Sequence, residues 1–64
     1  MKEIHFATIQ TKSNFRNLNG KSLRIAFFKG KTVVCWLFDF DFNREIEIEF
    51  LIDEISEITT VSVF

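Results

Sequence analysis

Strict alternation of polar and apolar residues is the feature that most constrains this chain. Over residues 45–52, Ile46, Ile48, Phe50 and Ile52 alternate with Glu45, Glu47, Glu49 and Leu51. Successive side chains of a strand point to opposite faces, so a period of two is typical of a β-strand with one face on a core. The same period recurs through most of the sequence, and we therefore expect an all-β protein.

Five segments carry this strand pattern: residues 3–10, 22–28, 32–42, 45–52 and 59–64. Residues 11–21 are polar and contain Asn19-Gly20, a pair suited to the positive φ angles of a tight turn, so they predict a long loop or an irregular hairpin. Gly30 turns the chain between the second and third strands. Asp53 can cap one short helical turn over residues 53–57, which isoleucines at three-residue spacing would seat on the core.

The segment 32–42 has an apolar face without interruption, made of Val34, Trp36, Phe38, Phe40 and Phe42. A two-residue turn at positions 43–44 would set Phe42, Phe40 and Phe38 against acids. A three-residue loop over residues 43–45 instead pairs Phe42 with Ile46 and buries both apolar faces together. We therefore predict this loop, which places Asp41 opposite Glu47 and Asp39 opposite Glu49.

A chain of 64 residues makes one domain, residues 1–64, and such a chain buries only about 60% of its unfolded surface. The hairpin over residues 32–52 and the following LIDEISEITTVSV resemble the small five-stranded barrels of the Sm and Src-homology kind, which also place a one-turn helix there. We expect a small five-stranded antiparallel barrel or a strongly bent sheet, with the short helical turn near Asp53 to Glu57. The resemblance implies a domain that binds nucleic acid or peptides.

The sequence indicates a cytoplasmic protein with no membrane association. Its single cysteine, Cys35, has no partner for an internal disulfide, and its first residues alternate instead of forming a leader peptide. No apolar stretch approaches the roughly 20 residues that a membrane-spanning helix needs. Abundant Phe, Ile, Asn and Lys fit an AT-rich coding sequence, which suggests a phage or another mobile element as the source.

Catalytic machinery is not expected. His5 and Cys35 are the only residues of their kinds and lie on different strands, and no phosphate-binding loop or nucleophile motif occurs. We predict no enzyme activity, no cofactor and no metal site. The acids at positions 39, 41, 47 and 49 are a minor candidate for a divalent cation, because a flat sheet rarely surrounds a hard cation with six or more oxygens.

Charge is divided unevenly along the chain: residues 1–36 hold seven bases and one acid, and residues 37–64 hold eight acids and one base. The two halves can compensate one another or attract outside partners. Our leading hypothesis is a non-enzymatic protein-interaction module that docks an acidic hairpin, residues 39–49, on a basic partner surface. Its candidate site residues are Asp39, Asp41, Glu45, Glu47 and Glu49. The same acids could serve only to solubilise the sheet or to guard its edge.

The basic half supports an alternative, a nucleic-acid-binding barrel that holds phosphates and stacks a base. Its candidate residues are Lys12, Phe15, Arg16, Lys21, Arg24, Lys29 and Lys31. Solvated loop lysines explain the same residues. Assembly is a third hypothesis, because residues 27–28 and 33–37 are apolar on both faces and need covering, either by a second copy in a homodimer or by the N-terminal strand.

Overall fold

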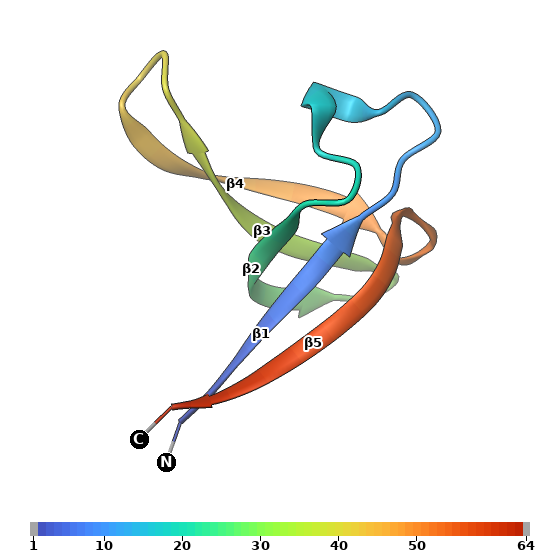
Figure 1. Ribbon diagram of the computed structural model, residues 1–64, viewed down its shortest axis with the longest axis vertical. Coiled ribbons are helices and arrows are strands. Elements are labelled where there is room, and N and C mark those ends of the chain that lie inside the picture. The colour runs from blue at the N-terminus through green and yellow to red at the C-terminus, as the bar shows by residue number, and fades with distance from the viewer. Residues whose placement is uncertain (1, 64) are drawn as a thin grey trace.

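The computed structural model describes residues 2–63 and consists of one antiparallel sheet of five strands (Figure 1). The strands are β1 (Lys2–Ile9), β2 (Ser22–Lys29), β3 (Thr32–Asp39), β4 (Arg44–Leu51) and β5 (Ile55–Val63). Their order across the sheet is β4-β3-β2-β1-β5, so the sheet is open and has β4 and β5 as its edges. Figure 1 shows the sheet bent so that β3 and β4 run across the direction of β1 and β5. The all-β fold class is confirmed, as a bent sheet and not as a closed barrel.

Two short 3-10 turns complete the fold, η1 (Phe15–Asn17) in the β1–β2 loop and η2 (Ile52–Glu54) between β4 and β5. The strands β1, β2 and β4 agree with the predicted segments to within one residue at each end. In contrast, β3 ends at Asp39 and not at residue 42, and β5 begins at Ile55 and not at residue 59. The predicted helical turn is present as η2, but it spans Ile52–Glu54 and not residues 53–57. Residues 55–57 belong to β5, and Ile52 and Ile58 are exposed instead of seated on the core. Within residues 2–63, no helix has the length and apolar character that crossing a membrane requires.

The register of the β3–β4 hairpin differs from the prediction. Leu37 lies opposite Ile46, Cys35 opposite Ile48, and Val33 opposite Phe50. The loop therefore has four residues, 40–43, and Asp39 lies opposite Arg44. The predicted three-residue loop is wrong, and so are the pairs that it implied, Asp41 with Glu47 and Asp39 with Glu49. The core side of β3 is its odd-numbered side, which carries its smaller apolar residues.

Turn chemistry explains the early end of β3. The Oδ1 atom of Asp39 accepts the backbone N–H of Asp41 at 2.9 Å and that of Phe42 at 3.3 Å. This is the arrangement by which aspartate begins a turn, and it removes Phe40 and Phe42 from the strand. Asn43 closes the loop with a φ of 53°, a left-handed conformation that asparagine tolerates better than most residues.

The core lies on one side of the bent sheet. Its buried members are Ala7, Ile9, Leu18, Ile25, Val33, Cys35 and Phe50. Leu18 comes from the β1–β2 loop, which also sets the ring of Phe15 edge-on against Phe50 at a centroid distance of 6.2 Å. The long loop over residues 11–21 is thus confirmed, and it covers part of the core with Leu18 and Phe15.

Hydrogen bonds order this loop internally. Thr11 is buried, and both its backbone N–H and its hydroxyl donate to Oδ1 of Asn19, at 2.8 and 3.2 Å. The predicted Asn19-Gly20 turn is present, with a φ of 85° at Gly20. The Gly20 N–H then donates to the carbonyl of Ile9 at 2.8 Å and returns the chain to the sheet.

A register shift interrupts β2 between Ile25 and Phe27. Ile25 lies opposite Cys35 before the shift, and Phe28 lies opposite Val33 after it. Phe27 therefore does not continue the face of Ile25, contrary to the alternation in the sequence. Both Phe27 and Phe28 are exposed, whereas residues 33–35 are buried within the single chain and need no second copy to cover them.

The two ends of the described chain lie together. Lys2 is opposite Val63 in the β1–β5 pair, which continues to Ile9 opposite Ile55 with one bulge. Figure 1 shows these ends at one pole of the long axis and the loop of the β3–β4 hairpin at the other.

Candidate functional site

The loop of the β3–β4 hairpin, residues 40–43, projects from the body of the molecule (Figure 1). We call this loop the tip. Phe40 is 85% exposed and Phe42 is 71% exposed, the two largest exposures among the large apolar side chains of residues 2–63. The Asp39 carboxylate holds the backbone beneath them, so the tip is an ordered turn that presents two phenylalanines to solvent.

Further contacts organise the aromatic rings around the tip. The ring of Phe38, at the end of β3, stands edge-on to that of Phe40 with 4.9 Å between the centroids and 69° between the planes. The guanidinium of Arg44 lies over the ring of Phe42, 5.8 Å from its centroid. Both geometries are favourable for aromatic rings, and together they restrict the conformations that the tip side chains can adopt.

An acidic row continues from the tip along the edge strand β4. It consists of Glu45, Glu47 and Glu49, all exposed and on one face. Their cross-strand neighbours in β3 are Phe38, Trp36 and Val34, respectively. Carboxylates at alternate positions of one strand are about 6.8 Å apart, so they do not repel one another as facing pairs would. The predicted crowded carboxylate patch is absent, and the acidic row instead lies beside two aromatic residues, Phe38 and Trp36, and the buried Val34.

No family model, curated protein or solved structure matches the chain. The geometry of the hairpin, with exposed aromatic residues and carboxylates on one projection, therefore carries the functional argument alone. Exposed aromatic groups of this kind are typical of surfaces that bind other proteins.

The two candidate aspartates have different surroundings from the acidic row. Asp39 is half-buried and its carboxylate is engaged in the turn. Asp41 and Asp39 line a hollow of about 370 Å³ together with Arg16 and Lys21 of the β1–β2 loop. Acidic and basic side chains from the two halves of the chain thus line the same hollow, whereas Glu45, Glu47 and Glu49 are not among its lining residues.

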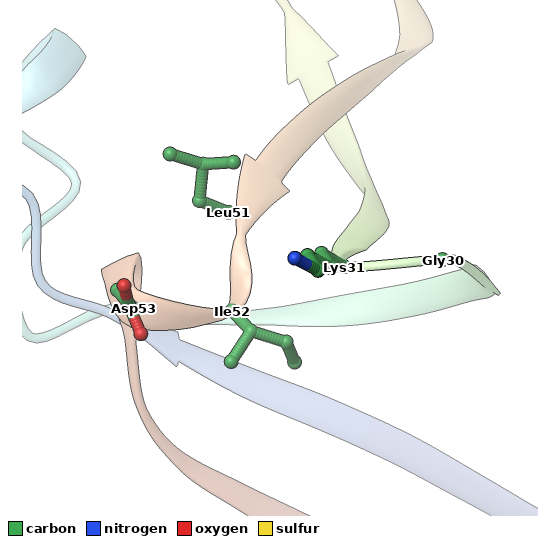
Figure 2. A pocket seen from close by; sticks show the side chains of 5 residues that line it. All are labelled: Gly30, Lys31, Leu51, Ile52 and Asp53. Carbon is green, nitrogen blue, oxygen red and sulfur yellow. The ribbon is translucent and has the colours of Figure 1, made fainter.

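The basic candidate residues lie in several separate places. Lys31 lines a hollow between the β2–β3 turn and η2 together with Leu51, Ile52 and Asp53, and Figure 2 shows the side chains of Leu51 and Ile52 pointing to opposite sides of the chain. Lys12 lines another hollow, with Asp53 and Glu54. In each of these hollows, as in the one with Arg16 and Lys21, a bound phosphate would also face a carboxylate.

The remaining residues of the basic candidate set lie in the fold packed on, or paired with, other residues. Phe15 packs on Phe50, and the guanidinium of Arg16 lies over the Phe15 ring at 5.6 Å from its centroid. Arg24 is opposite Phe6 in the β1–β2 pair, and Lys29 ends β2 opposite Thr32. These positions do not form one groove with the loop residues, so the set predicted from sequence is not brought together.

Neither His5 nor Cys35 takes part in the hairpin site. Nδ1 of His5 is 2.9 Å from the hydroxyl oxygen of Thr60, its neighbour across the β1–β5 pair. Cys35 is a free and buried thiol, and burial raises its pKa, which keeps it protonated and unreactive. Within residues 2–63, no three His, Cys, Asp or Glu side chains are grouped closely enough to hold a metal ion.

The sequence prediction named only the acids of this hairpin as site residues and did not include Phe40 and Phe42, which the structure places exposed at the tip. The prediction placed both phenylalanines in a strand whose aromatic face was expected to be buried. The signal that could have found them is the segment DFDFN, residues 39–43, in which an aspartate that can accept backbone N–H groups is followed at position 43 by asparagine.

Proposed function

We propose that this protein is a non-enzymatic interaction module that inserts its hairpin tip into an apolar site on a basic partner protein. The exposure of Phe40 and Phe42 on an ordered turn is the observation that carries the proposal. Burying a phenylalanine side chain contributes about 1.5 to 3 kcal/mol, and a few such aromatic anchors dominate most interfaces. Because the turn is held by Asp39, little conformational entropy is lost when the tip binds.

The acidic row predicts that the partner surface is basic. Glu45 and Glu47 lie beside Phe38 and Trp36, as polar residues border the apolar centre of a typical interface, and Glu49 continues the row along β4. Rim charges accelerate association and select orientation more than they add affinity, and salt screens them. The partner surface that fits is therefore an apolar pocket flanked by lysine or arginine.

The fold and the buried cysteine support two broader features of the proposal. The long first loop, the 3-10 turn before the last strand and the pairing of β1 with both β2 and β5 support the resemblance to small barrels of the Sm and Src-homology kind, many of which bind peptides. A lone buried thiol such as Cys35 supports action in the cytosol, where thiols stay reduced. An adaptor or inhibitor from a phage or mobile element is the role that suits a module of this size.

The first test compares tip variants in partner capture and in calorimetry with the captured protein. The double variant Phe40→Ala with Phe42→Ala should weaken binding by about 100-fold or more, since it removes two buried aromatic groups. Asp41→Lys with Glu47→Lys should also weaken binding and should reduce its dependence on salt. Phe28→Ala is the matched control, because Phe28 is 54% exposed but lies on β2, away from the tip. A partner held equally by the parent and by both double variants would refute the proposal.

A titration with oligonucleotides separates this proposal from nucleic-acid binding. Fluorescence anisotropy with single- and double-stranded oligonucleotides at low and moderate salt should detect no specific complex, because the basic residues share their hollows with carboxylates. Tight binding that weakens steeply with salt would instead assign the function to the basic residues.

A further inference from the structure

The sheet has two open edges, and only one of them is regular. Strand β5 carries a bulge at Ser56, the extra residue between the partners of Ile9 and Thr8. A bulge is one of the devices by which natural proteins protect an open edge. Strand β4 instead pairs with β3 in one unbroken register over its whole length, and no other strand of residues 2–63 lies beside it (Figure 1).

Hydrogen bonds at the end of β4 show which of its backbone groups face the open side. The N–H of Ile52 donates to the carbonyl of Lys31 at 3.1 Å, toward β3. The N–H of Leu51 points the other way and donates to Oε1 of Glu54 at 2.9 Å. Successive residues of an antiparallel strand direct their backbone groups to opposite sides in turn, and the register of β4 is unbroken. The N–H and C=O groups of the acidic row therefore face the open edge.

Side chains give this edge two different faces. One face carries the acidic row, in which Glu49 also accepts the hydroxyl of Thr32. The opposite face carries Phe50 and Ile48, and Ile48 is only partly buried. Beside these two residues is a hollow of about 200 Å³, which Phe15 of the β1–β2 loop also lines. A strand added to the edge would extend an acidic face and an apolar face at once.

We infer that the β4 edge takes an extended segment of a basic partner as a sixth, antiparallel strand, in which bases alternate with apolar residues. This inference rests on the proposed function, because it names the partner segment that the acidic row meets. Alternate residues are about 6.8 Å apart in both strands, so bases at every second position lie opposite the glutamates in one register. The apolar residues between them fall on the other face, beside Ile48 and the hollow.

Charge complementarity decides between this occupant and a second copy. Two β4 strands side by side would bring two acidic rows together, which is destabilising. The β5 strand of a second copy contains no base, and its bulge interrupts its edge. A basic segment is attracted instead, and main-chain hydrogen bonds along the edge would supply affinity while the alternate side chains supply specificity.

Synthetic peptides test the alternation. We expect the acetylated and amidated peptide TKVKVKT to bind the full chain about tenfold or more tightly than TKKVVKT, which has the same composition without the alternation. Glu47→Gln should weaken the binding of TKVKVKT about threefold, because it removes one cross-strand charge pair. Glu57→Gln is the matched control, since Glu57 is an exposed acid on β5. Isothermal titration calorimetry measures all four affinities.

Backbone readouts distinguish strand addition from charge attraction alone. In the antiparallel register, the N–H of each lysine of TKVKVKT bonds to the edge and the N–H of each valine points away. N-methylation of the central lysine should therefore weaken binding about tenfold or more, and N-methylation of one valine less than about twofold. Amide hydrogen exchange gives a further readout. The N–H groups of the acidic row should exchange about tenfold or more slowly with the peptide bound, whereas those of Ile46 and Ile48 already bond to β3 and should change little.

Three results would overturn the inference. They are unchanged exchange of the acidic row at millimolar TKVKVKT, equal binding of the two peptides, and a loss on N-methylation of valine that equals or exceeds the loss on N-methylation of lysine. Slow exchange of the same N–H groups in the free protein that increases with its concentration would also overturn it, by assigning the edge to a second copy.

The edge and the tip can fail separately in these experiments. Phe40→Ala with Phe42→Ala should leave the affinity for TKVKVKT unchanged, because the tip lies beyond the paired part of β4. If the peptide does not bind but partner capture depends on the tip, the strand inference is wrong and the docking function stands. If the peptide binds but partner capture ignores the tip, the docking function is wrong.

Discussion

At the scale of single residues, Asp39 decides where β3 ends and what the tip presents. Its carboxylate replaces a strand partner for the N–H groups of Asp41 and Phe42. Without that acceptor, the pairing of β3 with β4 would have no local reason to stop before Phe40. The alternating pattern assigns Phe40 and Phe42 to a strand, and the side chain of Asp39 therefore places them in an exposed turn instead.

Replacing this carboxylate should destabilise the hairpin. We expect Asp39→Ala to lower the free energy of unfolding by about 1 to 3 kcal/mol, because two backbone N–H groups lose their acceptor at about 0.5 to 1.5 kcal/mol each. Asp39→Asn keeps an acceptor oxygen at the same position and should retain most of the stability. Urea denaturation followed by tryptophan fluorescence of Trp36 measures both variants, and equal losses would contradict the role given to the carboxylate oxygen.

At the scale of elements, the two faces of β3 differ less in hydropathy than in packing. Leu37 packs against the core cluster and lies opposite Ile46, while its neighbour Phe38 is 41% exposed and lies opposite Glu45. The larger aromatic side chains are on the outer face. The core selects the smaller odd-numbered residues because these pair with Ile46, Ile48 and Phe50 of β4.

Placing a lysine on each face of β3 in turn tests this assignment. Leu37→Lys puts an ammonium group against the core and should cost about 3 kcal/mol. Phe38→Lys sets the ammonium group opposite Glu45, a favourable cross-strand pair, and should cost only about 1 kcal/mol for the lost aromatic contacts. Chemical denaturation compares the two variants. A larger loss for Phe38→Lys would show instead that the aromatic face is the buried one.

Most elements could be predicted from alternation and turn chemistry. Period-two patterns located all five strands, and Asn19-Gly20 and Gly30 marked turns that are present with positive φ angles. The face of β3 could not be assigned by alternation because both of its faces are apolar as far as Leu37. The shift in β2 lies between Ile25 and Phe27, around an alanine, and neither glycine nor proline marks it in the sequence.

The candidate site was predictable in part for the same reasons. Exposed glutamates on β4 follow directly from alternation, and the structure has them on one face. Their neighbours depend on the register, which is set by the side chain of Asp39 and by the packing of Val33 and Cys35 on the core. Long-range packing also explains why β5 begins at Ile55, since its first residues pair with β1 across almost the whole sequence.

At the scale of the whole molecule, the core is small for the apolar content of the chain. Within residues 2–63, seven apolar residues form the buried cluster, whereas eleven large apolar side chains are exposed, with Phe40 and Phe42 at one pole and Val61 and Val63 near the other. A domain of this size is near the limit of independent stability. Burial against a partner would add to its stability.

The adjacent chain ends have a practical consequence for how the protein can be displayed. Lys2 and Val63 lie side by side at the pole farthest from the tip (Figure 1). A tether attached at either end would leave Phe40 and Phe42 at the pole of the domain that faces away from the tether. Because the two ends are adjacent, the domain could also be inserted into a surface loop of a carrier protein without moving the two ends of that loop apart.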